Sequence, residues 1–255
     1  MVVADLQYPV RREGLYFAAV QGEGVIMDLV QNRYVALGRV STLLWDALQE
    51  QRRPDLLHSD TIRSAAGIGV EVDALAARQL EAWRSAGLLC GPGDEGVRQR
   101  VSLPIDRARE HETLEGVDWV RMWRSPVSPP MLGRLVYSNW LVKRSLKKHG
   151  LCSTLRSIQQ IAAAAPGAQP ALEDRLRLML RAYFSFRRLR DQGRDDCLAR
   201  SLALARALRR LRIDATVCFG VRKFPFLAHA WVEAGNQVVN ERVETIRGYA
   251  LLARF

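Results

Sequence analysis

The sequence predicts an α+β protein of two parts: a small winged-helix-like domain, and a larger domain in which helices pack on a small antiparallel sheet. Strand-like segments and then helices fill about the first 90 residues, whereas helices and then strand-like segments fill the second half. Between them, residues 90–96 read Cys-Gly-Pro-Gly-Asp-Glu-Gly, and Gly and Pro do not easily continue either element. We therefore expect a first domain over residues 1–90, a linker and the start of the second domain over residues 91–130, and a second domain over residues 131–255.

The first domain is expected to begin with strands and to end with helices. Short apolar runs separated by turn residues predict strands over residues 15–20, 24–30 and 33–37. Helices are expected from Ser41 to before Pro54, over residues 59–66, and from Val72 to about Leu88. Strands followed by three helices in about 90 residues are typical of a winged-helix-like domain.

The second domain is expected to place its helices before its strands. Apolar residues at helical spacing predict helices over residues 133–148, 153–165 and 171–190, and another from Asp195 and Asp196 to about Arg212. Strand-like runs follow over residues 215–221, 228–234 and 237–241. This order predicts a helical half that packs on a small antiparallel sheet.

The composition is that of an ordinary globular protein, with 48% hydrophobic and 25% charged residues. No run approaches 18 apolar residues, and the N-terminus lacks the basic and apolar regions of a secretory signal. We therefore expect a cytoplasmic location and no membrane contact. In such a reducing compartment the four cysteines, which form no CxxC pair, are expected to be separate thiols and not a metal site: Cys90, Cys152, Cys197 and Cys218.

The net charge of +11 is unevenly distributed along the chain. Residues 1–90 hold 9 Lys/Arg and 11 Asp/Glu, which leaves 29 of the 38 basic and 16 of the 27 acidic residues for residues 91–255. The arginines recur at helical spacing, as in Arg206, Arg209 and Arg210, which is typical of the solvated face of an amphipathic helix. Because the winged-helix-like part is net acidic, the wrong sign for phosphate contacts, we expect no nucleic-acid partner.

Cys197 is the candidate nucleophile. Asp196 is a good N-cap residue, since its carboxylate can accept hydrogen bonds from the first free N–H groups of the following helix. Cys197 then occupies the first helical position, where the partial positive charge of the helix end favours a thiolate over a thiol. The same N–H groups can hold a developing oxyanion. The alternative is a cysteine that only packs at a helix start.

His229 is the candidate general base. A thiol nucleophile needs a base, and histidine titrates in the right range. Of the four histidines, only His229 follows Cys197, and it lies 32 residues further on in the strand-like run Phe-Leu-Ala-His-Ala-Trp-Val-Glu. A cysteine on a helix that packs against a sheet supplying a histidine is the layout of papain-like and transglutaminase-like sites.

Asn240 and Glu241 compete to orient the imidazole. If the hairpin after His229 turns on Gly235 and Asn236 alone, Asn240 shares the face of His229 and Glu241 points away. A loop of three residues exchanges the two positions, because successive strand residues point to opposite faces. Either side chain can accept the imidazole N–H, so both alternatives stand.

These segments resemble the lasso peptide biosynthesis B protein family. The resemblance rests on three runs that begin at Cys197, Phe219 and Pro225: Cys-Leu-Ala-Arg-Ser-Leu-Ala-Leu, Phe-Gly-Val-Arg, and Pro-Phe-Leu-Ala-His-Ala-Trp-Val-Glu. It extends from about Ala182 to the C-terminus. It implies a transglutaminase-like fold and a peptidase that removes the leader from a ribosomally made precursor, with Cys197 as nucleophile and His229 as base. That family usually has Asn followed by Asp as the third element; Asn240 matches, and Glu241 stands in place of the Asp.

Residues 1–90 more loosely resemble the PqqD-like leader-recognition domain. In that family the leader peptide adds as a strand beside the third strand and against the third helix, which is β-augmentation. The resemblance implies a leader-binding surface formed by Arg33, Tyr34, Val35, Ala36, Leu37, Leu75, Arg78, Gln79 and Ala82. Tyr34 and Leu37 are the candidates for lining its pockets, with packing inside the domain as the alternative.

The resemblance also implies two partners, the precursor's leader peptide and an asparagine-synthetase-like lasso cyclase that depends on ATP. No Walker-type phosphate loop occurs in this chain, so no cofactor is expected from a motif, and ATP only by resemblance. The expected reaction is acyl transfer to water through a thioester. The alternatives are a transglutaminase or acyltransferase with the same site, and a non-enzymatic regulator that binds peptide or DNA.

Overall fold

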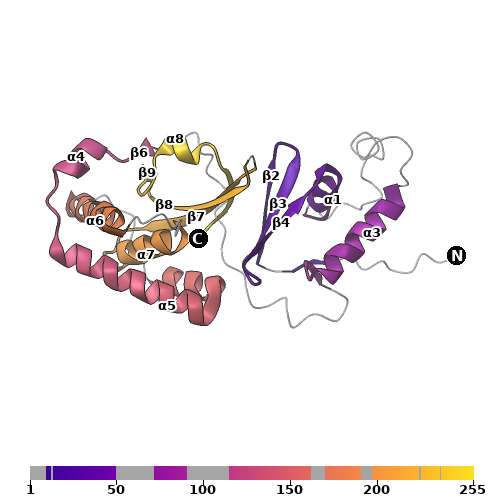
Figure 1. Cartoon of the computed structure of the whole chain (residues 1–255), viewed down its shortest axis with the longest axis horizontal. Coiled ribbons are helices and arrows are strands. Elements are labelled where there is room, and N and C mark those ends of the chain that lie inside the picture. Colours follow the sequence, from indigo (N-terminus) through magenta and orange to yellow (C-terminus); the bar gives the residue numbers. More distant parts are fainter. Residues whose placement is uncertain are drawn as a thin grey trace. The chain divides into compact units, whose positions relative to one another are not determined.

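A computed structural model describes eight segments of the chain, residues 10–12, 14–49, 72–90, 115–161, 170–190, 197–223, 225–235 and 237–255. The chain divides into two compact units, residues 1–103 and residues 104–255. Each unit contains its own antiparallel strands with helices packed against them (Figure 1). The expected helix over residues 59–66 and the expected cap, Asp195 and Asp196, lie outside the described residues.

The first unit is built on a meander of three strands in the order β2-β3-β4. The strands are β2 (Leu15–Val20), β3 (Glu23–Asp28) and β4 (Arg33–Leu37), and both pairs are antiparallel. Gln21 and Gly22 link β2 to β3, and both have positive φ, 52° and 80°. Two such residues in a row are what a tight hairpin matching the strand twist requires. The three strands predicted here are confirmed.

Two helices cover this sheet, α1 (Arg39–Gln49) and α3 (Val72–Ser85). Their tryptophans, Trp45 and Trp83, meet edge to face at 5.0 Å between ring centroids and lie in one core with Ile26 of β3. The sequence did not predict a second small sheet, in which β1 (Val10–Arg11) pairs with β5 (Leu89–Cys90). Runs of two residues carry too little alternation to be seen in a sequence.

The second unit is built on a five-stranded sheet in the order β10-β7-β8-β9-β6. Its strands are β6 (Glu115–Gly116), β7 (Ala215–Arg222), β8 (Leu227–Ala234), β9 (Gln237–Val238) and β10 (Ala250–Arg254). Its helices are α4 (Trp119–Arg124), α5 (Pro129–Gln159), α6 (Pro170–Arg190), α7 (Cys197–Arg210) and α8 (Val243–Ile246). Helix α7 lies between α5 and the sheet, where it contacts β7 and β8 (Figure 1).

The predicted fold class, α+β with helices packed on a small antiparallel sheet, is confirmed. The helices expected over residues 133–148 and 153–165 are both present as the two parts of α5, which is interrupted at Gly150, where φ is 76° and ψ is −179°. Two details differ. The last predicted strand, residues 237–241, stops at Val238. Strand β10 was not predicted, although it pairs with β7 and completes the sheet.

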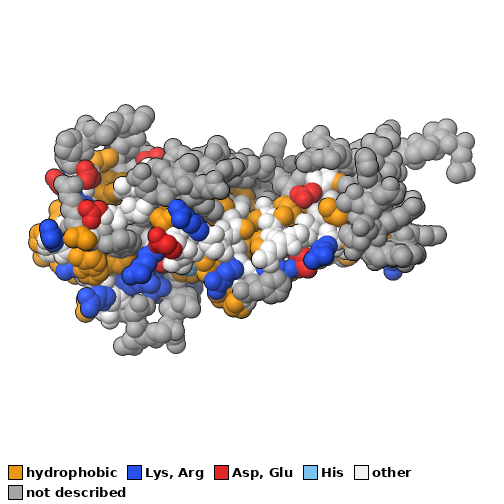
Figure 2. Space-filling model, turned by 90° about the horizontal axis from the view of Figure 1, so that it is seen from above, with side chains coloured by type: hydrophobic (Ala, Val, Ile, Leu, Met, Phe, Trp, Pro, Cys, Tyr) orange, Lys and Arg blue, Asp and Glu red, His pale blue; other side chains and the backbone are white. Residues whose placement is uncertain are grey.

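Among the described residues, no helix combines the length and the apolar character that crossing a bilayer requires. On the face drawn in Figure 2, the described Lys and Arg side chains lie among hydrophobic ones and are not gathered into one continuous patch. This distribution agrees with the expectation that many arginines occupy solvated helix faces.

Candidate active site

Cys197 is the first residue of α7, and its side chain is half-buried. The helix is held against the sheet one turn further on, where the buried Ser201 hydroxyl donates a hydrogen bond to the Ala230 carbonyl at 2.7 Å. Cys197 and Ser201 lie four residues apart and therefore share a helix face. This bond brings the sulfur to the stretch of β8 that carries His229, the residue before Ala230.

The thiol of Cys197 and the imidazole of His229 are close enough for each to shift the pKa of the other. Burial raises the pKa of the Cys197 thiol, but the hydrogen bond to His229, a backbone hydrogen bond with Ala230 and the charge of His229 together bring that pKa below its usual value. Burial lowers the pKa of His229, but the neighbouring Cys197 and Glu241 favour the charged imidazole, outweigh the effect of burial and raise that pKa to about 9. The two shifts act in the same sense: the lowered pKa of Cys197 favours its thiolate, and the raised pKa of His229 favours its imidazolium.

Glu241 faces the other side of the imidazole. Its Oε1 lies 3.6 Å from Nε2 of His229, which is an ion-pair distance and slightly longer than a hydrogen bond. The same Oε1 lies 3.4 Å from a guanidinium nitrogen of Arg187 on α6. Catalytic hydrogen bonds are often long in a free enzyme and shorten when substrate binds. Glu241 is thus placed to orient the imidazole and to stabilise its positive charge.

Asn240 is the residue before Glu241, but its side chain forms hydrogen bonds with other residues. Its Oδ1 accepts a hydrogen bond from the Val232 N–H at 2.8 Å, and its Nδ2 donates to the Ser201 hydroxyl at 3.0 Å. The side chain is 1% exposed, so these bonds are made away from water. Asn240 therefore ties the chain after β9 to β8 and α7.

The length of the hairpin loop does not decide which side chain faces His229, although the sequence analysis had linked the two. Ala234 pairs with Gln237, so the two-residue loop is the observed one. In that register Glu241 was expected to point away from His229, and this expectation is wrong. Strand β9 ends at Val238, and beyond it the alternation of faces no longer applies, which lets Glu241 turn towards the imidazole.

Sequence reasoning missed several residues around the imidazole. Tyr183 and Arg187 of α6 contact Asn240 and Glu241, respectively. The rings of Trp231 and Tyr249 lie 6.4 Å and 5.3 Å from the His229 ring between centroids. The spacing of Tyr183 and Arg187, one helix turn, was visible in the sequence, but nothing in it shows which face of α6 meets the sheet.

The five residues expected to bind the leader on the third strand all lie in β4, an edge of the described sheet. Tyr34 and Ala36 are exposed, whereas Val35 packs against the core and Leu37 belongs to it, with 4% of its side chain exposed. Arg33 donates hydrogen bonds to the Asp28 carboxylate and to the Ala86 carbonyl. Tyr34 and Ala36 are thus the exposed residues of β4, and the side chain of Arg33 is 38% exposed. Leu37 packs inside the domain, as the alternative prediction stated.

The four expected residues on the third helix lie along α3. Arg78 and Ala82 are exposed, and Leu75 and Gln79 are half-buried. Gln79 accepts a hydrogen bond from the Ser41 hydroxyl at 3.0 Å, which joins α3 to α1. The structure therefore leaves Arg78 and Ala82 as the accessible members of this set.

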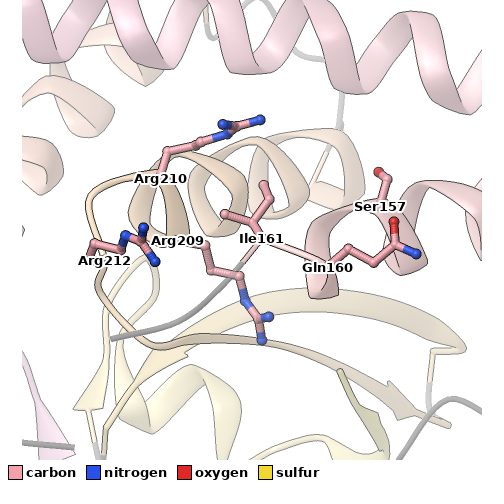
Figure 3. Close-up of a pocket in the computed structure, with 6 residues that line it drawn as sticks. All are labelled: Ser157, Gln160, Ile161, Arg209, Arg210 and Arg212. Atoms are coloured by element: carbon pink, nitrogen blue, oxygen red, sulfur yellow. The ribbon is translucent and has the colours of Figure 1, made fainter. Parts of the chain in front are cut away.

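A basic pocket lies at the opposite end of α7 from Cys197. It is lined by Ser157, Gln160, Ile161, Arg209, Arg210 and Arg212. Figure 3 shows the Arg209 and Arg210 side chains extending in opposite directions, so the guanidinium groups do not converge on one ligand. Arg209 donates to the Ala215 and Gln159 carbonyls, which closes the end of α7 onto the neighbouring elements. Within the described segments, no group of three His, Cys, Asp or Glu side chains is placed to hold a metal ion.

Comparison with known proteins defines the class of the second unit. Residues 141–254 match the family model of the transglutaminase-like superfamily, so the chain carries a transglutaminase-like core domain, a domain of cysteine-dependent enzymes. The chain is also a distant homologue of the microcin J25-processing protein McjB of Escherichia coli, with 50% identity over 48 residues. That match spans 19% of this chain and 23% of the length of McjB.

Among solved structures, the chain is similar to TbiB1 in complex with the TbiA(beta) leader peptide. The likeness has 25% sequence identity, covers 33% of this chain and 98% of that chain, and has a TM-score of 0.26.

Proposed function

We propose that this chain is a cysteine peptidase that removes the leader peptide from a ribosomally synthesised lasso peptide precursor. The observation that carries the proposal is the thiol of Cys197 next to the imidazole of His229, whose Nε2 lies 3.6 Å from Glu241, within a transglutaminase-like domain. Distant homology to a microcin-processing protein supports a peptide substrate.

The proposed reaction is acyl transfer to water. Since Nε2 of His229 faces Glu241, Nδ1 is left to face the thiol. The Cys197 thiolate attacks the carbonyl carbon of the leader–core peptide bond, and backbone N–H groups at the start of α7 stabilise the oxyanion. The His229 imidazolium protonates the leaving amine, and the C–N bond breaks to leave a thioester. His229 then takes a proton from a water molecule, whose oxygen attacks the thioester carbonyl. The C–S bond breaks, the leader leaves as a carboxylic acid, and Cys197 returns as a thiolate beside the imidazolium.

Leader capture is proposed for the first unit. Strand β4 pairs only with β3 in the described sheet, so among the described residues its other edge carries no paired strand and can accept an added one. Main-chain hydrogen bonds would supply affinity, and the exposed Tyr34 and Ala36 would contact side chains of the leader. With capture and cleavage on one chain, tethering raises the local concentration of substrate at the thiol. The lasso cyclase is the proposed partner that receives the freed core peptide.

The test uses the full chain and a precursor peptide, with cleavage followed by mass spectrometry. Cys197→Ala should abolish cleavage, because no other group in the site can form the thioester. Cys152→Ala is the matched control, since Cys152 is a half-buried free thiol of the same unit outside the site, and it should cleave normally. Cleavage by Cys197→Ala at the wild-type rate would refute the nucleophile assignment.

A transglutaminase-like domain also suits an amine as acceptor, and this is the second candidate. An acyl-enzyme that is captured by an amine yields an amide, and one that is captured by water yields an acid. Precursor incubated with wild-type protein and excess amine should give the free acid under the first proposal. A product mass increased by the amine would favour the second.

A further inference from the structure

Helix α6 supplies two side chains to the segment that carries Glu241. Tyr183 and Arg187 lie one turn apart and so share a face of the helix. Tyr183 is close enough to Asn240 for this amide to act on the pKa of its hydroxyl, and Arg187 pairs with Glu241 at 3.4 Å. Two neighbouring residues after β9 are thus each held by one residue of the same helix face.

Glu241 needs such a contact because the sheet does not hold it. Strand β9 ends three residues earlier, so no ladder hydrogen bond fixes the backbone at this position. The glutamate side chain has three rotatable bonds, and its carboxylate is placed only if something restrains them. Arg187 contacts the same oxygen, Oε1, that faces Nε2 of His229. The side chain of Arg187 is 30% exposed and that of Glu241 is 17% exposed, so the pair is partly shielded from water.

We propose that Arg187, assisted by Tyr183, is a positioning residue that holds the Glu241 carboxylate against His229 and acts on Cys197 through these two side chains. The inference rests on the proposed function for its effect on turnover. Its effect on the thiol itself is independent of the substrate, which allows the two to be tested separately.

The charged and titratable groups around this pair come from several elements. Helix α6 contributes Arg187 and Tyr183, and α7 contributes Cys197. Arg200 of α7 also acts here, since its charge lowers the pKa of Tyr183. Tyr249, which precedes β10, faces the His229 ring and is itself covered by Arg222 of β7. Among these groups Glu241 carries the carboxylate that raises the pKa of His229, so a displaced Glu241 should lower it.

The expected effect of Arg187→Met is therefore a narrower range of pH in which the thiolate and the imidazolium coexist. With a freely moving Glu241 the imidazolium loses part of its support, so the thiolate of Cys197 should form at higher pH and the imidazolium should be lost at lower pH. We expect kcat to fall roughly 10- to 100-fold, the scale of a misplaced catalytic group. KM should change little, since Arg187 touches the site through Glu241.

The experiment measures alkylation of Cys197 by iodoacetamide against pH in the full chain, with the Cys197 peptide followed by mass spectrometry. Arg187→Met should move the midpoint of alkylation to higher pH, and Arg187→Lys should restore part of the shift. Arg188→Met is the matched control, because Arg188 is the next residue and lies over the Trp123 ring, 5.8 Å from its centroid. It should leave the profile unchanged.

A double-mutant cycle separates positioning from a general loss of structure. If Arg187 acts through Glu241, Arg187→Met should have little further effect in a Glu241→Gln background. Tyr183→Phe should shift the profile less, because Asn240 keeps its bonds to Val232 and Ser201. An unchanged alkylation profile in Arg187→Met, or an equal shift in the Glu241→Gln background, would overturn the inference. A shifted profile in a protein that cleaves no precursor would leave the inference standing and remove the proposed function.

Discussion

At the scale of single residues, the site depends on two groups whose pKa values move in opposite directions. The pKa of Cys197 is lowered and the pKa of His229 is raised to about 9, and each residue is a cause of the other's pKa shift. Such a pair titrates as a unit, and its apparent pKa values belong to the pair. In the proposed mechanism turnover needs the thiolate as nucleophile and the imidazolium as acid, so we expect a bell-shaped dependence of kcat/KM on pH.

Glu241→Gln tests the contribution of the carboxylate to this profile. Glu241 is among the causes that raise the pKa of His229, so its neutral replacement should lower that pKa and move the alkaline limb to lower pH. We expect kcat to fall about tenfold or more, since the imidazolium loses its ionic partner. The measurement is kcat/KM for precursor cleavage between about pH 5 and pH 10, a range that includes the ordinary pKa values of histidine and cysteine. An alkaline limb that does not move would show that Glu241 does not act on His229.

At the scale of elements, the site is placed by the contact of α7 with β8. Two buried polar side chains, Ser201 and Asn240, join α7, β8 and the segment after β9 through consecutive hydrogen bonds. Each is nearly inaccessible to water, so removing one partner would leave another group unsatisfied. The start of α7, which carries Cys197, is therefore held against the strand that carries His229 by two buried polar side chains.

Gly220→Ala tests how tightly the sheet packs next to His229, with which Gly220 pairs across β7 and β8. A methyl group at Gly220 would come within 2.8 Å of the Trp231 ring, which is fully buried and lies beside the His229 ring. We expect the free energy of unfolding to fall by about 1–3 kcal/mol, the usual cost of overpacking. Chemical denaturation measures this change.

Gly133→Ala provides the opposite case in the same unit. Gly133 lies inside α5, and an added methyl group would meet nothing within 4 Å. Because glycine loses more backbone entropy than alanine in a helix, we expect the free energy of unfolding to rise by roughly 0.5–1 kcal/mol. Equal changes in the free energy of unfolding for Gly220→Ala and Gly133→Ala would contradict the close packing of Gly220 against Trp231.

At the scale of the whole molecule, the chain combines a transglutaminase-like unit with a separate compact unit whose sheet ends in an edge strand. The two tasks proposed for them, cleavage and capture, can therefore be removed independently. A variant without the thiol should still bind leader peptide, because Cys197 lies in the second unit.

Tyr34→Ala tests capture in a full chain that also carries Cys197→Ala, which prevents turnover during the titration. Tyr34 is exposed on β4, and loss of an aromatic contact at an edge strand should weaken leader binding about tenfold or more. Val30→Ala is the control, since Val30 is 50% exposed in the turn before β4 and lies off the strand. Fluorescence anisotropy with labelled leader peptide measures both. Equal affinities in the two variants would argue against β4 as the binding edge.

Much of the fold could be predicted because its long elements have strong periodicity. The strands of the first unit, helix α6 and the pair β7 and β8 carry enough residues for their period to be read. The short elements β1, β5, β6 and α8 have four residues or fewer, and contacts distant in the chain stabilise them. Their existence depends on packing, which local sequence does not encode.

The sequence by itself determined the order of the two parts, the helix that begins at Cys197 and the strand that carries His229, since cap, period and residue type are local properties. Only the tertiary structure decided between Asn240 and Glu241 as the neighbour of the imidazole. The observed loop predicted Asn240, but β9 ends at Val238, and the contacts of α6 and α7 then set the direction of each side chain. Where the strand ladder ends, side-chain direction is fixed by neighbours distant in the chain and no longer by alternation along it.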